Sequence, residues 1–466
     1  MRRELSAQPS AFRSTTDRRL TVLLALLLGL AGGAVAGEPQ PPFDVFPEAE
    51  PPYYRVRYAA GATGPLDLPV KYTVWIPPGI ETLRGVVIHQ HGCGPGSCSS
   101  GLTGAYDLHW QALAKKHGCA LLSPSYEQQK DENCLRWCDP RNGSLGALDT
   151  ALADLAKASG HDELDDVPWA LWGHSGGGYW AGIATLERPD RIAAAWLRSG
   201  TPLVTPREDR PSAKVVTVPE QPLGVPMMLN LGTEEGVTKT DTKFAGVWPR
   251  AVEFFTATRG RGNLVGVAID PLTGHQCGNQ RYLAIPWFDA CLAARLPTEP
   301  GQPLRPMPTD EAWLADLREP IAKPETEFEG DPLDAGWLPN AEVAAAWQQY
   351  VTDADVPDTT PPPSPTDVRV IDGEIAWTAD ADLQSGVRQF VILKDNERIG
   401  LVPEKPRNRF GRPLFQDLLY SDTPAQPLAE MTFADPRIKA DEASRYTVRA
   451  INTVGLKSPL RPAASK

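Results

Sequence analysis

The chain has 466 residues, of which 41% are hydrophobic and 22% are charged, and these values are ordinary for a globular protein with a large core. A length of this size predicts two or three domains and argues against disorder throughout the chain or a protein with several membrane spans. The formal net charge is −12, and no run of Lys or Arg follows the N-terminal region. The sequence therefore lacks the basic face that a nucleic-acid partner needs.

Residues 1–36 have the pattern of a signal peptide. Arg18 and Arg19 precede an apolar run over 20–31, and the small residues of 34–36 form a cleavage site. The run is shorter than the roughly 20 apolar residues that a membrane span needs. We expect cleavage, a secreted or periplasmic mature protein and no stable membrane insertion; an uncleaved anchor is the alternative.

Export also makes disulfides an expectation, since the seven cysteines all follow the signal. The odd number leaves at least one free thiol. The simplest hypothesis pairs sequence neighbours and leaves one cysteine in a strand-like run unpaired: Cys93–Cys98, Cys134–Cys138 and Cys277–Cys291, with Cys119 free. The Cys-x-x-Cys or Cys/His spacing of a zinc site is missing from the sequence, so we expect no metal.

Strand-like and helix-like runs alternate from about residue 70 to residue 296. The expected strands are 70–76, 85–91, 120–126, 169–172, 193–197, 226–231 and 264–269. The expected helices are 107–117, 144–159, 176–186, 247–258 and 280–296. This alternation predicts right-handed crossovers and a mainly parallel sheet with helices on both faces. We assign residues 37–296 to this α/β domain.

The remainder divides into two parts. Of the 47 prolines, 14 lie between Pro297 and Pro365, so we interpret residues 297–360 as a Pro-rich linker with short helices at 310–317 and 341–350. From residue 361 to residue 466 the runs become short and alternating, at 368–371, 374–377, 388–394 and 446–452. That texture predicts a small all-β sandwich.

The strongest chemical motif is Gly-His-Ser-Gly-Gly at 173–177, between an apolar strand and an amphipathic helix. A serine on such a tight turn needs Gly at the flanking positions, and the turn lifts its Oγ clear of the sheet. We therefore predict that Ser175 is a nucleophile. A glycine-rich turn that merely packs tightly or binds a phosphate is the alternative.

A serine hydroxyl needs a base, and His275 follows the last expected strand and precedes the last expected helix of the α/β domain. Chain order Ser, acid, His places the acid after the strand 226–231. Glu235 has the favoured spacing, and Glu234, Asp241 and Asp270 are the alternatives.

A developing oxyanion needs two backbone N–H donors. Gly176, directly after the serine, supplies one, and Cys93, in the His-Gly-Cys-Gly loop at 91–94, supplies the other. An ordinary glycine-rich turn is the alternative for this loop. These groups are sufficient for acyl transfer, so we expect no cofactor.

Ser175, Glu235 and His275 in this order, with His91 and Gly92 ahead of them, resemble the α/β-hydrolase family over about residues 70–296. The His-Gly-Cys run, the stretch 112–119 and the Trp/Cys loop 134–138 are similar to secreted esterases related to polyhydroxybutyrate depolymerases and feruloyl or acetylxylan esterases. The resemblance implies a serine hydrolase that cleaves small-molecule or polymer-linked carboxylic esters. A serine peptidase and a catalytically inactive exported binding protein are the alternatives.

The C-terminal region resembles a fibronectin type III domain through the Asp-Thr-Thr-Pro-Pro run at 358–362, Trp377 and the stretch 446–455. In such sandwiches Trp377 and Tyr446 are core residues. The resemblance implies a domain that binds an insoluble polymer or serves as a spacer.

Overall fold

The computed structural model describes residues 48–427 and 431–462, so the expected signal peptide lies outside the described residues. Within this part of the chain, no helix has both the length and the apolar character needed to cross a membrane.

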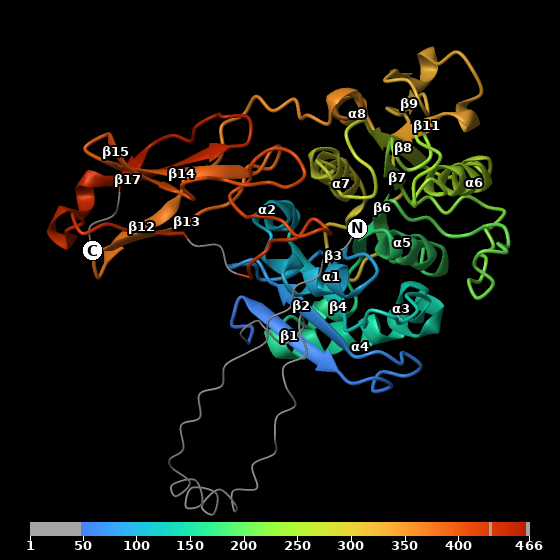
Figure 1. The fold of residues 1–466 in the computed structure, drawn as a ribbon, viewed down its shortest axis with the longest axis horizontal. Helices are drawn as coiled ribbons and strands as arrows, with labels where there is room; N and C mark the ends of the chain where they lie inside the picture. Colours follow the sequence, from blue (N-terminus) through green and yellow to red (C-terminus); the bar gives the residue numbers. More distant parts are fainter. Residues whose placement is uncertain (1–47, 428–430, 463–466) are drawn as a thin grey trace, which may run out of the picture.

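A sheet of eight strands forms the centre of the larger part of the molecule (Figure 1). Its order is β1-β2-β4-β3-β5-β6-β7-β8, in which β1, β2 and β4 pair antiparallel and the neighbours from β4 to β8 pair parallel. The strands are β1 (Tyr53–Tyr58), β2 (Val70–Trp75), β3 (Gly85–Gln90), β4 (Cys119–Tyr126), β5 (Trp169–His174), β6 (Ile192–Arg198), β7 (Met227–Gly232) and β8 (Val265–Asp270). The expected strands are all present, and β1 is an additional edge strand.

Helices cover both faces of this sheet. One face carries α4 (Ser144–Ser159), α5 (Gly176–Glu187) and α6 (Val247–Arg259), and the other carries α2 (Leu108–Lys116), α7 (Arg281–Arg295) and α8 (Ala341–Asp353). Two short helices, α1 (Pro95–Cys98) and α3 (Leu135–Cys138), lie in loops. Because side chains alternate along a strand, Trp169 and Leu171 of β5 enter the first core, while Ala170 and Trp172 enter the second. The prediction of a mainly parallel sheet between two helical layers is therefore confirmed.

Part of the region expected to be a linker packs on this sheet. The helix expected at 310–317 is wrong: the chain there forms β9 (Trp313–Ala315), which pairs with β10 (Ala322–Pro324) and β11 (Gly336–Leu338). A helix of eight residues has little stability of its own, whereas two flanking partners provide backbone hydrogen bonds to β9. The helix expected at 341–350 is confirmed as α8, whose Trp347 donates a hydrogen bond to the Val267 carbonyl of β8 at 2.7 Å.

The C-terminal β-region, residues 361–462, contains two antiparallel sheets, as predicted. One has the order β12-β13-β16 and the other β15-β14-β17-β18. The strands are β12 (Thr366–Ile371), β13 (Glu374–Thr378), β14 (Val387–Lys394), β15 (Glu397–Val402), β16 (Thr432–Ala434), β17 (Tyr446–Asn452) and β18 (Arg461–Pro462). Trp377 and Tyr446 are buried between the sheets, which confirms their prediction as core residues.

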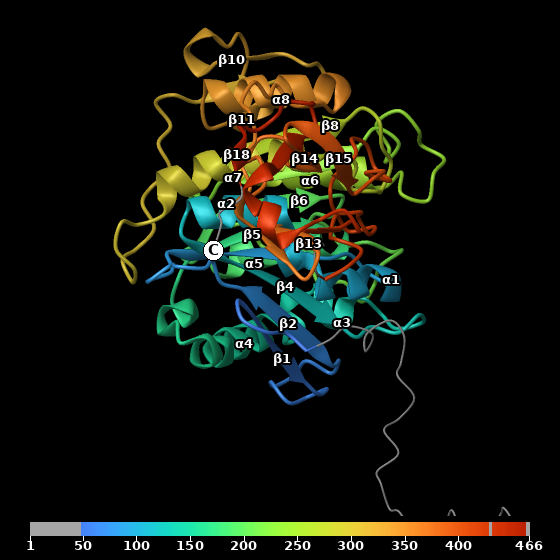
Figure 2. The ribbon, with the colours of Figure 1, turned by 90° about the vertical axis from the view of Figure 1, so that its left-hand side faces the viewer.

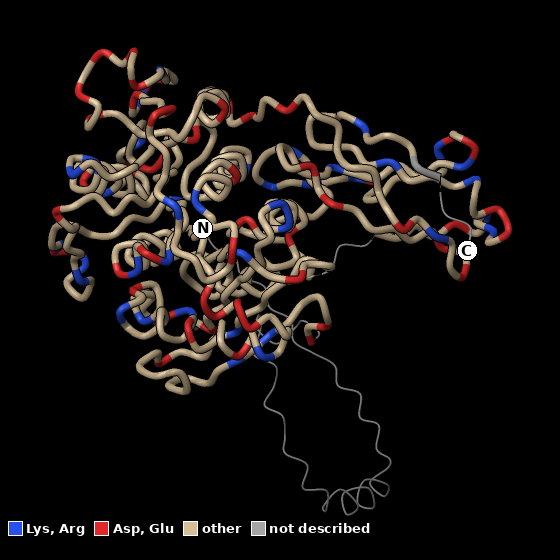
Figure 3. The backbone as a smooth tube through the Cα atoms, turned by 180° about the vertical axis from the view of Figure 1, so that it is seen from behind, with Lys and Arg blue, Asp and Glu red and all other residues tan. Residues whose placement is uncertain are grey.

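The C-terminal β-region lies against the larger part of the molecule on the side of α2 and α7 (Figures 1 and 2). The loop 403–427, which follows β15, enters the interface. Its Asp422 forms a buried ion pair with Arg281 at 2.9 Å, and Arg281 also pairs with Asp107 at 2.8 Å. Figure 3 shows basic and acidic residues interspersed along the chain in both parts of the molecule.

Candidate active site

Ser175 occupies the tight turn between β5 and α5, with φ 54° and ψ −113°. Few residues other than glycine adopt this backbone conformation, and such strain is typical of functional positions. The Ser175 N–H donates to the Arg198 carbonyl at 2.6 Å, which fixes the turn against the end of β6. The strand, the turn and the helix therefore present the Ser175 side chain at the carboxyl edge of the sheet.

The flanking glycines are required by close backbone contacts. A Cβ on Gly173 would lie 2.1 Å from the Gly177 carbonyl oxygen, and one on Gly177 would lie 2.4 Å from the His91 carbonyl oxygen. A Cβ on Gly200, after β6, would lie 1.8 Å from the Ser175 carbonyl oxygen. The turn can adopt its conformation only because these three positions lack side chains.

His275 and Glu235 complete a hydrogen-bonded row with the serine. His275 Nε2 lies 2.8 Å from Ser175 Oγ, and His275 Nδ1 lies 2.6 Å from Glu235 Oε1. His275 follows β8 and Glu235 follows β7, so the ends of three parallel strands bring the three side chains together. The structure thus places these side chains as the sequence led us to expect, and their catalytic role is taken up as a proposal below.

The environment of Glu235 keeps its carboxylate ionised. It is fully buried, and its Oε2 accepts hydrogen bonds from Ser199 Oγ at 2.7 Å and from the Gly232 N–H at 2.8 Å. Burial alone would raise the pKa of Glu235, but the His275 hydrogen bond and the nearby Arg198 charge bring it below its ordinary value.

The other candidate acids lie elsewhere. Glu234 is bonded to Lys239 on the surface, and Asp241 is exposed. Asp270 accepts a hydrogen bond from Tyr350 at 3.0 Å. Of the four carboxylates, Glu235 is the one that contacts His275 within the described residues.

The backbone N–H groups of Cys93 and Gly176 are the predicted oxyanion donors. Neither donates to another residue in the part of the chain that the structure describes, and both residues line the cavity next to Ser175. A disulfide joins Cys93 to Cys134, and a Cβ on Gly176 would lie 2.2 Å from Cys93 Sγ. The disulfide therefore packs directly on Gly176 and holds the 91–94 loop beside the serine.

This disulfide replaces the pairings expected from sequence, which are wrong. Cys93–Cys134 links residues 41 apart, and Cys98, Cys119, Cys138, Cys277 and Cys291 are free and buried. The pairing follows the contact between the 91–94 loop and α3, which sequence proximity does not reveal. The prediction that Cys119 is free is confirmed. The Cys138 sulfur lies within 4.8 Å of the two disulfide sulfurs, but burial raises the pKa of its thiol, so it is not a thiolate.

The C-terminal β-region contributes Ser421 to the surroundings of the site. Ser421 Oγ accepts a hydrogen bond from the Gly92 N–H at 3.2 Å and lies 3.1 Å from His174 Nδ1. His174 Nε2 in turn lies 2.8 Å from the carbonyl oxygen of His275. Ser421 therefore contacts the loop that carries Cys93 directly and is linked through His174 to the loop that carries His275.

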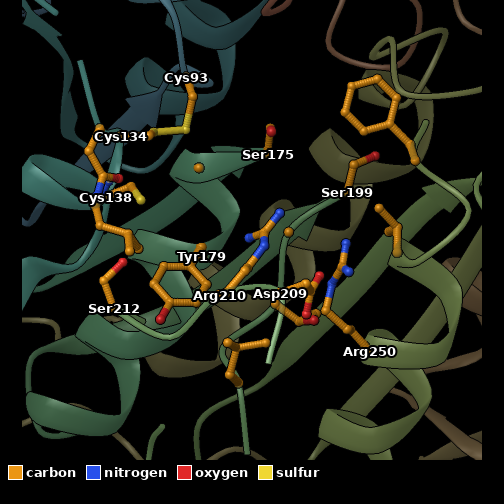
Figure 4. A pocket seen from close by; sticks show the side chains of 18 of the residues that line it. Cys93, Cys134, Cys138, Ser175, Tyr179, Ser199, Asp209, Arg210, Ser212 and Arg250 are labelled. Atoms are coloured by element: carbon orange, nitrogen blue, oxygen red, sulfur yellow. A yellow bond between two sulfur atoms is a disulfide. The ribbon is translucent and has the colours of Figure 1, made fainter. Parts of the chain in front are cut away.

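A cavity of about 470 Å³ opens beside Ser175 (Figure 4). Its walls include the Cys93–Cys134 disulfide, Tyr179 of α5 and Arg250 of α6. The connection between β6 and β7 supplies a further wall that includes Arg210. This volume is within the range of pockets that bind small organic ligands.

No protein-family model and no curated protein matches the chain. Matching solved structures include a poly(aspartic acid) hydrolase from Sphingomonas sp. KT-1, with 18% identity and a TM-score of 0.35 over 49% of this chain and 94% of the other. A siderophore hydrolase from Aspergillus nidulans has 16% identity and a TM-score of 0.33 over 49% of this chain and 90% of the other. A ferulic acid esterase has 15% identity and a TM-score of 0.31 over 48% and 90%. The fold is that of the α/β-hydrolases. The observed strand order and the helical layers on both faces of the sheet support this assignment.

Three further residues around Glu235 and His275 were not predicted. Arg198 is fully buried and donates to Thr273 Oγ1 and to the Gly274 and Gln276 carbonyls, so it shapes the loop that carries His275. Ser199 bonds Glu235, and Phe244 stacks on the His275 ring with centroids 3.7 Å apart. A charged Arg at the end of the apolar run 192–197 was the one available signal.

Proposed function

We propose that this α/β-hydrolase is a serine hydrolase that cleaves carboxylic esters through an acyl-enzyme. The continuous row Ser175–His275–Glu235, with contacts of 2.8 and 2.6 Å, is the observation that carries the proposal. A base within hydrogen-bond reach of a serine, itself oriented by a buried carboxylate, is the arrangement that activates a hydroxyl.

In the first half-reaction, His275 Nε2 takes the proton of Ser175 Oγ as that oxygen bonds to the ester carbonyl carbon. The carbonyl oxygen becomes negative and accepts hydrogen bonds from the Cys93 and Gly176 N–H groups. The carbon–alkoxide bond then breaks, and the leaving alkoxide takes the proton from His275. Glu235 stabilises the transient imidazolium and fixes the tautomer that presents a basic Nε2.

In the second half-reaction, His275 removes a proton from water while the water oxygen attacks the acyl carbon. Collapse of this intermediate releases the carboxylic acid and returns the proton to Ser175 Oγ. Every proton-transfer group comes from the chain itself. The ionised state of Glu235, favoured by the lowered pKa of its carboxyl, suits it to this role at neutral pH.

We also propose that the mature protein begins after residue 36 and works outside the cytoplasm, either secreted or in the periplasm. A disulfide against the predicted oxyanion loop supports this location, because such bonds persist in oxidising compartments. The catalytic domain would start at residue 37, and the C-terminal β-region would be a fibronectin type III-like domain. An insoluble polymer that retains the protein would support a binding role for that domain.

Turnover of ester substrates by wild type and Ser175→Ala tests the proposal. Wild type should hydrolyse short-chain para-nitrophenyl esters, and Ser175→Ala should lose at least about a thousandfold of kcat with its fold unchanged. Undiminished ester turnover in Ser175→Ala would contradict the proposal. A folded wild type that cleaves peptides and not esters would favour the peptidase alternative, and one that cleaves neither would favour a binding protein.

A further inference from the structure

Two guanidinium groups lie in the cavity that holds Ser175. Arg250, on α6, is half-buried, and Arg210, in the connection between β6 and β7, is more exposed. Figure 4 shows both side chains reaching into this cavity. They therefore enter the space that an ester bound at Ser175 would occupy.

Neither guanidinium has a hydrogen-bonded or ion-paired partner within the described residues. No hydrogen bond or salt bridge joins the side chain of Arg210 or Arg250 to another group in this part of the chain. Asp209 is the carboxylate among the cavity-lining residues, and it already pairs with Arg207, whose Nε lies 3.1 Å from Asp209 Oδ1. The cavity wall thus combines two arginines with one aspartate, and that aspartate is already paired with Arg207, which lies outside the cavity lining.

The electrostatics agree with this geometry. Burial lowers the pKa of Arg250, the neighbouring positive charges of Arg210 and Arg207 lower it further, and the carboxylates of Asp209 and Glu235 only partly oppose this shift. Like charges gathered in a partly desolvated pocket repel each other, and an anionic ligand would relieve that repulsion.

We infer that the cavity selects esters that also carry an ionised carboxylate group, which Arg210 and Arg250 bind while Ser175 attacks the ester carbonyl. This inference rests on the proposed function and names its substrate class. A planar guanidinium matches a carboxylate in a two-pronged hydrogen-bonded contact, so two of them hold one group firmly in position. Half-esters of dicarboxylic acids and esters of hydroxy acids are the two forms that such a substrate takes.

Matched substrate pairs test the inference on either side of the ester. Mono-para-nitrophenyl adipate is compared with para-nitrophenyl hexanoate, which has the same acyl length without the charge. The acetate ester of para-hydroxybenzoate, which carries the carboxylate on its alcohol side, is compared with para-tolyl acetate, which lacks that charge. In one pair at least, wild type should favour the anionic ester by about tenfold to a hundredfold in kcat/KM, the effect expected of hydrogen bonds to a charged group.

Replacing the arginines should remove this preference. Arg210→Gln and Arg250→Gln should each lower the anionic-to-neutral ratio by about tenfold, and the double variant should bring it close to one. Arg188→Gln is the matched control: Arg188 bonds Asp149 at 2.9 Å and lies outside the cavity lining, so its ratio should equal that of wild type. Added salt should also lower the wild-type ratio, because it screens exposed charges.

Binding without turnover separates the two proposals. Ser175→Ala, titrated calorimetrically with mono-para-nitrophenyl adipate and with the acetate of para-hydroxybenzoate, should bind at least one of them more tightly than Ser175→Ala/Arg250→Gln does. Equal turnover of the anionic and neutral esters in both pairs, with ratios that the arginine variants leave unchanged, would overturn the inference and leave the ester-hydrolase proposal standing. Arginine-dependent binding by Ser175→Ala in a protein whose wild type turns over no ester would instead overturn the proposed function alone.

Discussion

Glu234 and Glu235 are adjacent in the sequence but differ completely in environment. The Glu235 side chain points inward, where His275, Ser199 and the Gly232 N–H bind its two oxygens. Glu234 points outward to Lys239. Substitution of Glu234 therefore serves as the control for the same substitution of Glu235.

Glu235→Gln should lower kcat by about a hundredfold to ten-thousandfold, because an amide can hold the imidazole in the wrong tautomer and cannot stabilise its charged form. Glu234→Gln should leave kcat near wild type, because its partner is a surface lysine and exposed pairs contribute little. Steady-state kinetics with a neutral para-nitrophenyl ester measure both. Equal losses in the two variants would contradict the assignment of the acid.

Residues that belong to a sequence motif could be predicted, whereas residues that reach the site only through contacts in the folded chain could not. The position of Ser175 on a turn was predictable because a strand, a Gly-flanked serine and a helix follow one another. The position of His275 was predictable because it follows the last strand of the sheet. Ser199 and Phe244 have ordinary local sequences, and only the packing of the β6–β7 connection and of the segment before α6 brings them to Glu235 and His275. Their contacts could not be derived from spacing.

At the scale of elements, periodicity predicted the strands and helices of the hydrolase sheet, because their buried faces repeat regularly. It failed where an element depends on distant partners. The strand β9 has three residues and exists because β10 and β11 flank it. The Cys93–Cys134 bond likewise depends on the contact between the 91–94 loop and α3.

The loop 403–427 gives the C-terminal β-region a direct connection to the proposed site. Ser421→Ala would leave the Gly92 N–H and His174 Nδ1 without their partner and loosen both loops. We expect kcat to fall about threefold to thirtyfold with little change in KM, since Ser421 positions other groups and lies outside the cavity lining.

The control for this positioning role is Ser458→Ala. Ser458 is also a buried serine of the C-terminal β-region, and its Oγ accepts a hydrogen bond from the Ala450 N–H at 3.0 Å, away from the site. The free energy of unfolding should fall by a similar amount in both variants, and kcat should fall only in Ser421→Ala. Parallel losses of kcat in the two variants would mean that Ser421 has only a structural role.

At the scale of the whole molecule, a buried charge network joins the two parts. Asp107 caps α2, Arg281 begins α7 and Asp422 comes from the loop 403–427, and all three are nearly inaccessible to solvent. Gln280 donates a further hydrogen bond to Asp422 at 2.8 Å. The sequence alone suggested either a binding domain or a spacer. It did not reveal this interface, because nothing in the local pattern of 420–423 indicates one.

This network makes stability depend on pH. Burial raises the pKa of Asp422 to about 6, against the opposing effect of Arg281. The folded state therefore holds the Asp422 proton more tightly than the unfolded state does. The resulting stability is fully present below the ordinary carboxyl pKa of about 3.9 and is lost as the pH rises through about 6.

Urea unfolding of wild type and Asp422→Asn at about pH 5 and about pH 8 measures this contribution. The free energy of unfolding of wild type, relative to that of the variant, should be larger at the lower pH. The uncharged amide of the variant does not titrate, so the comparison isolates Asp422. A difference that is equal at both pH values, or larger at the higher one, would contradict a raised pKa of Asp422 in the folded state.

The most direct test of the central claim, that Ser175 is activated by His275, is labelling of the folded protein with a fluorophosphonate probe followed by peptide mass spectrometry. We predict one covalent adduct on Ser175, abolished in Ser175→Ala and slowed at least about a hundredfold in His275→Ala, because the probe reacts with activated serines. Folded protein that forms no adduct, or that labels equally fast without His275, would contradict the account.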